Sequence, residues 1–128
     1  MMLNRIILFF LVSLPFLCVS AQQQKPTVYF PRYTYDLGKL SQKHPLRRVK
    51  FLFRNDGTEP LIIHEARPSC GCMTVAYTKK PIPSGQWGAL IVTYNAKGYP
   101  PGIFSKTVML TTNGKPPYYQ VKIKGEHL

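Results

Sequence analysis

Residues 47–57 read R-R-V-K-F-L-F-R-N-D-G, and their alternation decides the fold class. In an extended chain, side chains point to opposite faces with a period of two, so Val49, Phe51 and Phe53 fall on one face. The opposite face carries the cations Arg48, Lys50 and Arg54. Residues 55–57 (N-D-G) tolerate positive φ, so a tight turn is expected where the alternation ends. The stretch predicts a strand that is buried on one side.

Short stretches of the same type recur along the chain at intervals of about ten residues. They are residues 27–30, 35–40, 47–54, 61–64, 74–77, 89–94, 104–110 and 118–124. The 12 prolines are spread through the chain, and no apolar set at helical spacing persists for three turns. We therefore expect an all-β fold, an immunoglobulin-like antiparallel β-sandwich of about seven to eight strands.

The N-terminus has the layout of a secretory signal peptide. Arg5 precedes an apolar run from Ile6, and Val19-Ser20-Ala21 presents small residues before a polar stretch. We predict a signal peptide over residues 1–21 and a single domain over residues 22–128, with no transmembrane segment after cleavage. The protein would then be exported to the periplasm or cell surface. Lipidation at Cys18 is the less favoured alternative, because Leu17 stands where lipoprotein processing needs a small residue.

The chain is strongly basic. Removing residues 1–21 takes away one positive charge, Arg5, so the formal net charge falls from +12 to about +11. Such a surface favours anionic partners, and for an exported protein these are acidic envelope glycans, lipid headgroups or an envelope protein rather than nucleic acid. If the strands that carry them are neighbours, one cationic face would combine Arg48, Lys50, Arg54, Lys122 and Lys124. The alternative is a solvated outer face that serves solubility alone.

Cys70 and Cys72 flank a glycine in the stretch S-C-G-C-M, residues 69–73. In an extended segment both sulfurs would share a face and could bind Cu(I), with His64 or Met73 as extra ligands. A turn at Gly71 would instead allow a small, strained disulfide suited to thiol exchange. A structural role is the third interpretation and the one we favour, because compact cysteines are often buried. The expected cofactor is therefore none, with Cu(I) as the alternative.

From Phe51 onward, the order of features resembles that of one bacterial family. The shared features are Phe51-x-Phe53-x-Asn55-x-Gly57, Pro60-Leu61-x-Ile63, Ser69-Cys70-Gly71-Cys72, Ile82-Pro83-Ser84-Gly85, Leu90-x-Val92-x-Tyr94, Gly102-x-Phe104-x-Lys106-Thr107-Val108-x-Leu110, Thr112-Asn113 and Gly125. They resemble the domain of unknown function 1573, allied to Hydin-type immunoglobulin-like domains. The resemblance implies a small exported sandwich and no assigned enzyme activity. One departure is Met73, where members often carry threonine directly after the second cysteine.

No catalytic serine motif, phosphate-binding glycine loop or His-Glu metal motif occurs in the sequence. With 5 acidic residues, paired carboxylates for glycoside chemistry are not expected either. We therefore expect no enzyme. The sequence predicts an exported, non-enzymatic binding or assembly module of the cell envelope. The alternative is a thiol-redox or Cu(I)-binding periplasmic protein that uses Cys70 and Cys72.

Overall fold

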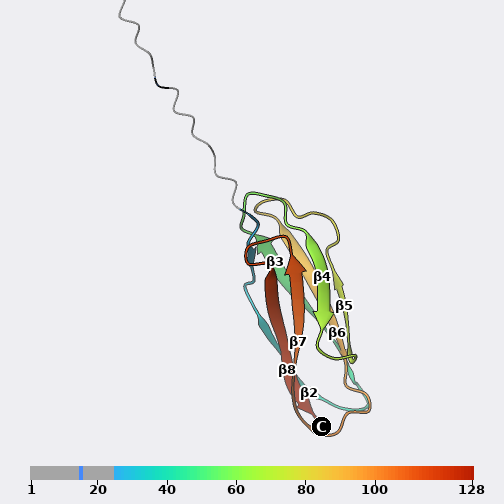
Figure 1. Ribbon diagram of the computed structural model, residues 1–128. Helices are drawn as coiled ribbons and strands as arrows, with labels where there is room; N and C mark the ends of the chain where they lie inside the picture. The colour runs from blue at the N-terminus through green and yellow to red at the C-terminus, as the bar shows by residue number, and fades with distance from the viewer. Residues whose placement is uncertain (1–14, 16–24) are drawn as a thin grey trace, which may run out of the picture.

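The computed structural model describes residue 15 and residues 25–128 (Figure 1). Apart from residue 15, the predicted signal peptide lies outside the described residues, and so does Cys18. Among the residues that are described, no helix is long and apolar enough to cross a membrane.

All regular structure in residues 25–128 is extended. The eight strands are β1 (Val28–Tyr29), β2 (Thr34–Leu40), β3 (Leu46–Asn55), β4 (Ile63–Pro68), β5 (Met73–Tyr77), β6 (Trp87–Asn95), β7 (Gly102–Thr112) and β8 (Tyr118–His127). Each overlaps a stretch predicted from the sequence. The largest difference is in β4, which begins at Ile63 because Leu61 makes only an isolated bridge to Ile82.

The strands form two four-stranded sheets that pack face to face, with β7 and β8 in front in Figure 1. The strand order is β1-β3-β6-β5 in sheet A and β2-β8-β7-β4 in sheet B. This is the arrangement of an immunoglobulin-like sandwich whose first strand is divided between the sheets. The predicted all-β sandwich is confirmed. One pair differs from the antiparallel prediction, since β2 runs parallel to β8.

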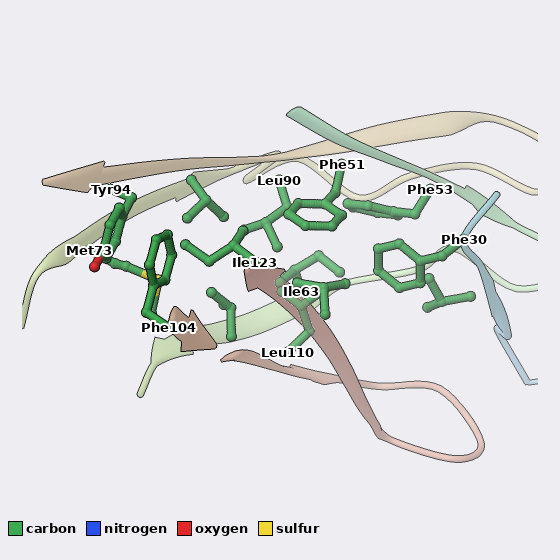
Figure 2. Close-up of a cluster of buried hydrophobic side chains, with 14 of the residues drawn as sticks. Phe30, Phe51, Phe53, Ile63, Met73, Leu90, Tyr94, Phe104, Leu110 and Ile123 are labelled. Atoms are coloured by element: carbon green, nitrogen blue, oxygen red, sulfur yellow. The ribbon is translucent and has the colours of Figure 1, made fainter. Parts of the chain in front are cut away.

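The core lies between the sheets and is built from the inward members of each alternating strand (Figure 2). Phe51 and Phe53 of β3 are fully buried, as are Leu90 and Val92 of β6. Because the side-chain period is two, the outward residues of the same strands remain exposed. The predicted inward face of β3 is confirmed at Phe51 and Phe53, and Val49 on the same face is partly buried.

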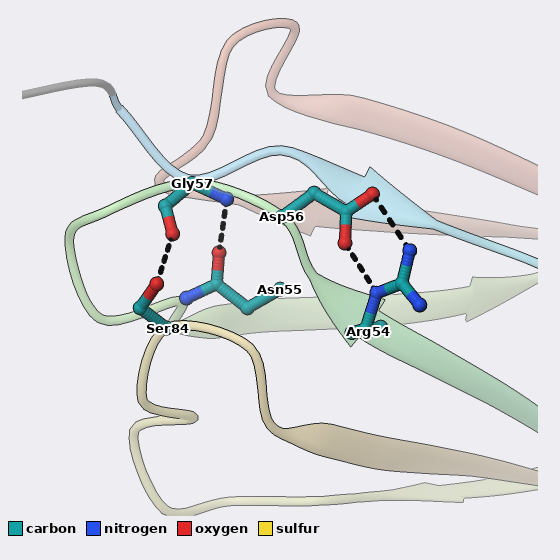
Figure 3. A network of polar contacts seen from close by, with 5 residues as sticks. All are labelled: Arg54, Asn55, Asp56, Gly57 and Ser84. Carbon is teal, nitrogen blue, oxygen red and sulfur yellow. Dashed lines mark hydrogen bonds and ion pairs between the residues drawn. The ribbon is translucent and has the colours of Figure 1, made fainter.

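The end of β3 differs from the predicted tight turn. No residue of 55–57 has positive φ, and the chain crosses from sheet A to sheet B instead of folding back. The Asn55 side chain organises this crossing by accepting a hydrogen bond from the Gly57 N–H at 2.9 Å (Figure 3). Gly57 is needed for close packing, because a Cβ there would lie 2.5 Å from the backbone of Lys25 and Pro26.

Candidate functional site

The longest open strand edge in the described part of the chain belongs to β3. Its neighbour β1 pairs with it at only two positions, Val28 with Asn55 and Tyr29 with Arg54. After Tyr29, Phe30 is buried in the core, and Pro31 has no backbone N–H to continue the ladder. The chain then enters sheet B as β2. Most of β3 is therefore left without a neighbour on this side.

The backbone hydrogen bonds show which groups face this open edge. The Asn55 N–H donates to the Gln86 carbonyl, and the Ala96 N–H donates to the Pro45 carbonyl. In an antiparallel ladder alternate residues bond to the same neighbour, so odd-numbered residues of β3 bond to β6. The backbone N–H and C=O groups of the even-numbered residues point away from β6. The open edge therefore presents the backbone N–H and C=O groups of Arg48, Lys50 and Leu52.

The sandwich is also incompletely closed beside this edge. Val49 of β3 and Tyr35 and Leu37 of β2 pack against the core but are only partly buried. The Tyr35 ring meets the Phe51 ring edge-on, with centroids 4.8 Å apart, so β2 lies across from the β3 edge. These inward side chains form an apolar rim that a further strand would cover.

The cations on the outer face of β3 differ in their pairing. Arg54 lies between the exposed rings of Tyr29 and Trp87, at 4.7 Å and 5.4 Å from the two ring centroids. It also pairs with Asp56, and its hydrogen bond holds the pKa of Asp56 below the ordinary value. The side-chain ion pairs among the described residues include neither Arg48 nor Lys50. Arg48 and Lys50 are therefore the cations available to a partner.

The structure does not bring the five predicted patch residues together. Arg48, Lys50 and Arg54 point outward from β3 in sheet A, whereas Lys122 and Lys124 point outward from β8 in sheet B. The two groups lie on opposite faces of the sandwich. The condition for one continuous cationic face, that β3 and β8 be neighbours, is not met, and binding of an anionic partner by either group stays a prediction.

Cys70 and Cys72 lie in the turn that crosses from β4 in sheet B to β5 in sheet A. The turn is closed by a hydrogen bond from the Met73 N–H to the Cys70 carbonyl at 3.2 Å. The two sulfurs form a disulfide, with the Cα atoms 5.2 Å apart. The extended arrangement considered for Cu(I) is therefore not present. The chain instead turns at Gly71, as the disulfide interpretation required.

The predicted extra metal ligands lie elsewhere. Met73 is buried in the core beside Tyr94 and Phe104 (Figure 2). His64 is exposed on β4, and its carbonyl accepts a hydrogen bond from the Tyr77 hydroxyl. No group of three or more His, Cys, Asp or Glu side chains in residues 25–128 could hold a metal ion together. Cu(I) binding would need reduction of the disulfide first, because Cu(I) takes thiolate ligands, and it stays a prediction.

A polar and aromatic cluster that the sequence did not reveal lies beside the cysteine turn. The Tyr99 hydroxyl lies 3.4 Å from Sγ of Cys70, and the Tyr99 ring packs on the His127 ring with centroids 5.6 Å apart. His127 is buried, and its Nε2 lies 2.6 Å from the Tyr94 hydroxyl. Burial raises the pKa of Tyr94 above the ordinary tyrosine value. Tyr99 and Cys70 are 29 positions apart in the chain, and no local pattern connects them.

The fold matches solved structures. A protein of unknown function from Porphyromonas gingivalis W83 superposes with a TM-score of 0.69 at 19% identity, over 81% of this chain and 48% of that one. The ASH / PapD-like domain 7 of human CEP192 superposes with a TM-score of 0.57 at 11% identity, over 83% of this chain and 87% of that one. The VesB protease of Vibrio cholerae gives a TM-score of 0.53 at 12% identity, over 80% of this chain and 31% of that one.

At these identities the likeness shows the fold alone. The chain spans about half the length of the Porphyromonas gingivalis protein it matches. No curated protein matches it. A family model described as "Protein of unknown function (DUF1573)" matches residues 28–127, which include all eight strands. The chain therefore belongs to the DUF1573 family.

Proposed function

We propose that the protein is an exported, non-enzymatic assembly module of the bacterial cell envelope. It binds an extended segment of a partner protein along the open edge of β3. The observation that carries this proposal is that β1 covers a strand of 10 residues at only Arg54 and Asn55. An added strand would continue the line of β1 and pair with the free backbone groups of Arg48, Lys50 and Leu52.

The other edges suit an added strand less well. The edge strand β2 is interrupted by a register shift between Asp36 and Lys39. β4 is irregular near His64 and ends at Pro68, and the Tyr77 side chain of β5 reaches across to it. Register shifts, prolines and covering side chains are the devices by which proteins block edge pairing. The β3–β6 pairing runs without a register shift, so β3 is the regular edge.

The side chains beside the edge define the chemistry of the partner. Toward the core, the rim of Val49, Tyr35 and Leu37 would accept apolar side chains. Toward solvent, Arg48 and Lys50 would face the outward side chains of the added strand, where acidic residues pair best. Because side chains alternate along a strand, the partner segment should alternate apolar and acidic residues. Without such a partner, the same two cations would discourage pairing with other chains.

Export rests on the signal-peptide pattern of residues 1–21, and the envelope role rests on export together with the basic charge of the chain. The sandwich fold, which it shares with the PapD-like domain of CEP192, suits a binding module, and one fold hosts many functions. The function therefore has to be tested at the β3 edge itself.

The test uses a synthetic peptide of about seven residues that alternates valine and glutamate, with both ends blocked. Binding is followed by the NMR shifts of backbone amides in isotope-labelled protein. We expect the largest shifts at Arg48, Lys50 and Leu52. The charge-reversed double variant Arg48→Glu, Lys50→Glu should weaken binding by about tenfold or more. The matched control is Lys122→Glu, Lys124→Glu, which changes the net charge equally on the opposite face and should leave affinity within about threefold.

Several results would overturn the proposal. Equal loss of affinity in both double variants would show that the peptide responds to overall charge and not to the edge. Amide shifts centred on β2, β4 or β5 would show that the peptide binds at another strand edge. If an acidic polysaccharide bound tightly and the peptide did not bind, the partner would be a glycan and not a protein segment.

A further inference from the structure

We infer that the Cys70–Cys72 disulfide is a thiol-exchange site that oxidises dithiols of exported proteins, with Cys72 as the sulfur that is attacked and Cys70 as the leaving group. This inference is independent of the β3 edge. It rests on different environments for the two sulfurs and on the weak structural role of the bridge.

The sulfur of Cys70 is held by two hydrogen-bond donors. The Cys72 backbone N–H donates to it at 3.2 Å. The Tyr99 hydroxyl lies at 3.4 Å, and because a disulfide sulfur carries no hydrogen, the hydroxyl is the donor. Hydrogen bonds of this kind strengthen when the acceptor becomes anionic. Both donors would therefore stabilise a thiolate on Cys70 if the bridge were opened, which is what a leaving group requires.

Cys72 has a different environment. It lines an open hollow of about 390 Å³ on the outer face of sheet A, at the end of β5 and β6. Thr74, Asn95, Lys97 and Tyr99 also line this hollow. A partner thiolate could enter it, and Lys97 would attract the negative charge of that thiolate. The geometry thus offers one cysteine beside an open hollow and one sulfur whose thiolate would be stabilised as it leaves.

A purely structural bridge explains this turn less well. The entropy that a cross-link removes from the unfolded chain grows with the length of the loop it closes, and only Gly71 stands between the two cysteines. The turn is already held by the hydrogen bond from the Met73 N–H to the Cys70 carbonyl and by the hydrogen bonds of Ser69. Ser69 donates its N–H to the Thr107 carbonyl, and its Oγ accepts from the Thr107 N–H at 3.0 Å. The fold therefore does not depend on the disulfide to hold this crossing.

The exchange proceeds in two balanced steps. A partner thiolate attacks Sγ of Cys72, the Cys70–Cys72 bond breaks, and its electron pair leaves on Cys70, which takes a proton from water. The second partner thiol, once deprotonated, attacks the partner sulfur of the mixed disulfide and releases Cys72, which is protonated in turn. The partner dithiol becomes a disulfide, and Cys70 and Cys72 become thiols. Two electrons and two protons have moved from the partner to this protein.

The first experiment measures the reactivity of each cysteine. In the full chain carrying Cys18→Ser, Cys70→Ser leaves only Cys72, and Cys72→Ser leaves only Cys70. Each variant is reduced, freed of reductant and mixed with dithiobis(nitrobenzoate). Circular dichroism confirms that both are folded. Because the two donors also raise the thiolate fraction of Cys70, the rates are compared at about pH 9.5 or above, where both thiols are largely ionised. There we expect the Cys72 thiol to react about tenfold faster than the Cys70 thiol, because Cys72 lines the hollow. Equal rates, or faster reaction at Cys70, would overturn the assignment of the two sulfurs.

The second experiment follows opening of the bridge in the folded protein. With both cysteines present and Cys18→Ser retained, excess reduced glutathione is added, and samples are alkylated and analysed by mass spectrometry. We expect reduction without denaturant. Tyr99→Phe should slow it by about threefold or more, while the exposed control Tyr118→Phe should leave the rate unchanged. A bridge that opens only in denaturant would establish a structural disulfide. Reduction of Tyr99→Phe at the wild-type rate would show that the Tyr99 hydroxyl has no part in opening the disulfide.

Discussion

The hydroxyl of Tyr94 lies 2.6 Å from Nε2 of His127, and this buried contact joins the end of β6 in sheet A to the end of β8 in sheet B. Tyr94 is fully buried, and its ring stacks with Phe104 at 4.6 Å between centroids. Tyr94→Phe keeps the ring but leaves the buried His127 nitrogen without its partner. We expect the free energy of unfolding to fall by about 1–3 kcal/mol. Urea denaturation followed by circular dichroism measures it.

Tyr118→Phe is the matched control for that substitution. Tyr118 is 62% exposed, so loss of its hydroxyl should change the free energy of unfolding by no more than about 0.5 kcal/mol. If both variants were equally stable, the Tyr94–His127 contact would make no net contribution to folding.

The raised pKa of Tyr94 also predicts how the free energy of unfolding changes at alkaline pH. Burial raises the pKa of Tyr94 in the folded protein above its unfolded value. The folded state therefore holds this proton more tightly, which adds stability below the ordinary tyrosine pKa. That stability is lost as the pH rises through the folded pKa. Urea midpoints measured between about pH 8 and about pH 11 should fall more steeply for the wild type than for Tyr94→Phe. Parallel curves would contradict the assignment.

Substitution of Asn55 should lower the free energy of unfolding more than substitution of most other polar residues. Its side chain is fully buried and donates to the Glu59 and Ile82 carbonyls at 2.8 and 3.0 Å, in addition to the Gly57 contact. Asn55→Ala leaves all three backbone groups without this partner. We expect a loss of about 3 kcal/mol, from roughly 1 kcal/mol per bond.

The control for Asn55 is Asn95→Ala, because Asn95 is exposed and caps one backbone N–H, that of Lys97. It should lose about 1 kcal/mol or less in the same urea titration. A loss at Asn95 equal to that at Asn55 would show that burial does not set the cost.

The strands and their buried faces were predictable because alternation is a local signal. Val49, Phe51 and Phe53 show their common face within five residues of sequence. Which strands become neighbours depends on the path of the whole chain, so Lys122 could not be placed relative to Lys50. The prediction of a tight turn after β3 was wrong for a local reason. The Asn-Asp-Gly composition suits positive φ, but here the Asn55 side chain bonds the backbone and replaces that geometry.

The candidate sites were predictable only in part. The cysteine pair was visible in the sequence, and a turn at Gly71 was one of the arrangements considered for it. Tyr99 was not assigned to the pair because it reaches Cys70 from the β6–β7 connection, far along the chain. The open β3 edge was also missed, since it arises where the chain leaves sheet A after Tyr29. Pro31 was its only local signal.

Reduction of the disulfide should cost little stability. The closed loop holds a single intervening residue, and by the chain-entropy relation the bridge contributes less than about 2 kcal/mol. Cys70→Ser, Cys72→Ser in the Cys18→Ser background should therefore remain folded, with a urea midpoint slightly below that of the oxidised protein. Complete unfolding of the double variant, or of the reduced protein, would show that the bridge holds the β4–β5 crossing.

The open edge of β3 predicts an alternating pattern of hydrogen exchange that needs no partner to be measured. The amides of Val49, Phe51 and others of odd number bond to β6 and should exchange slowly, because opening them requires disruption of the central sheet. The amides of Arg48, Lys50 and Leu52 face solvent and should exchange about a hundredfold faster or more. NMR exchange on labelled protein resolves each residue. Arg54 is the internal control, since its amide faces the same side but is covered by Tyr29 of β1 and should be slower than that of Lys50. Uniform protection along β3 would mean that another part of the chain already covers the edge.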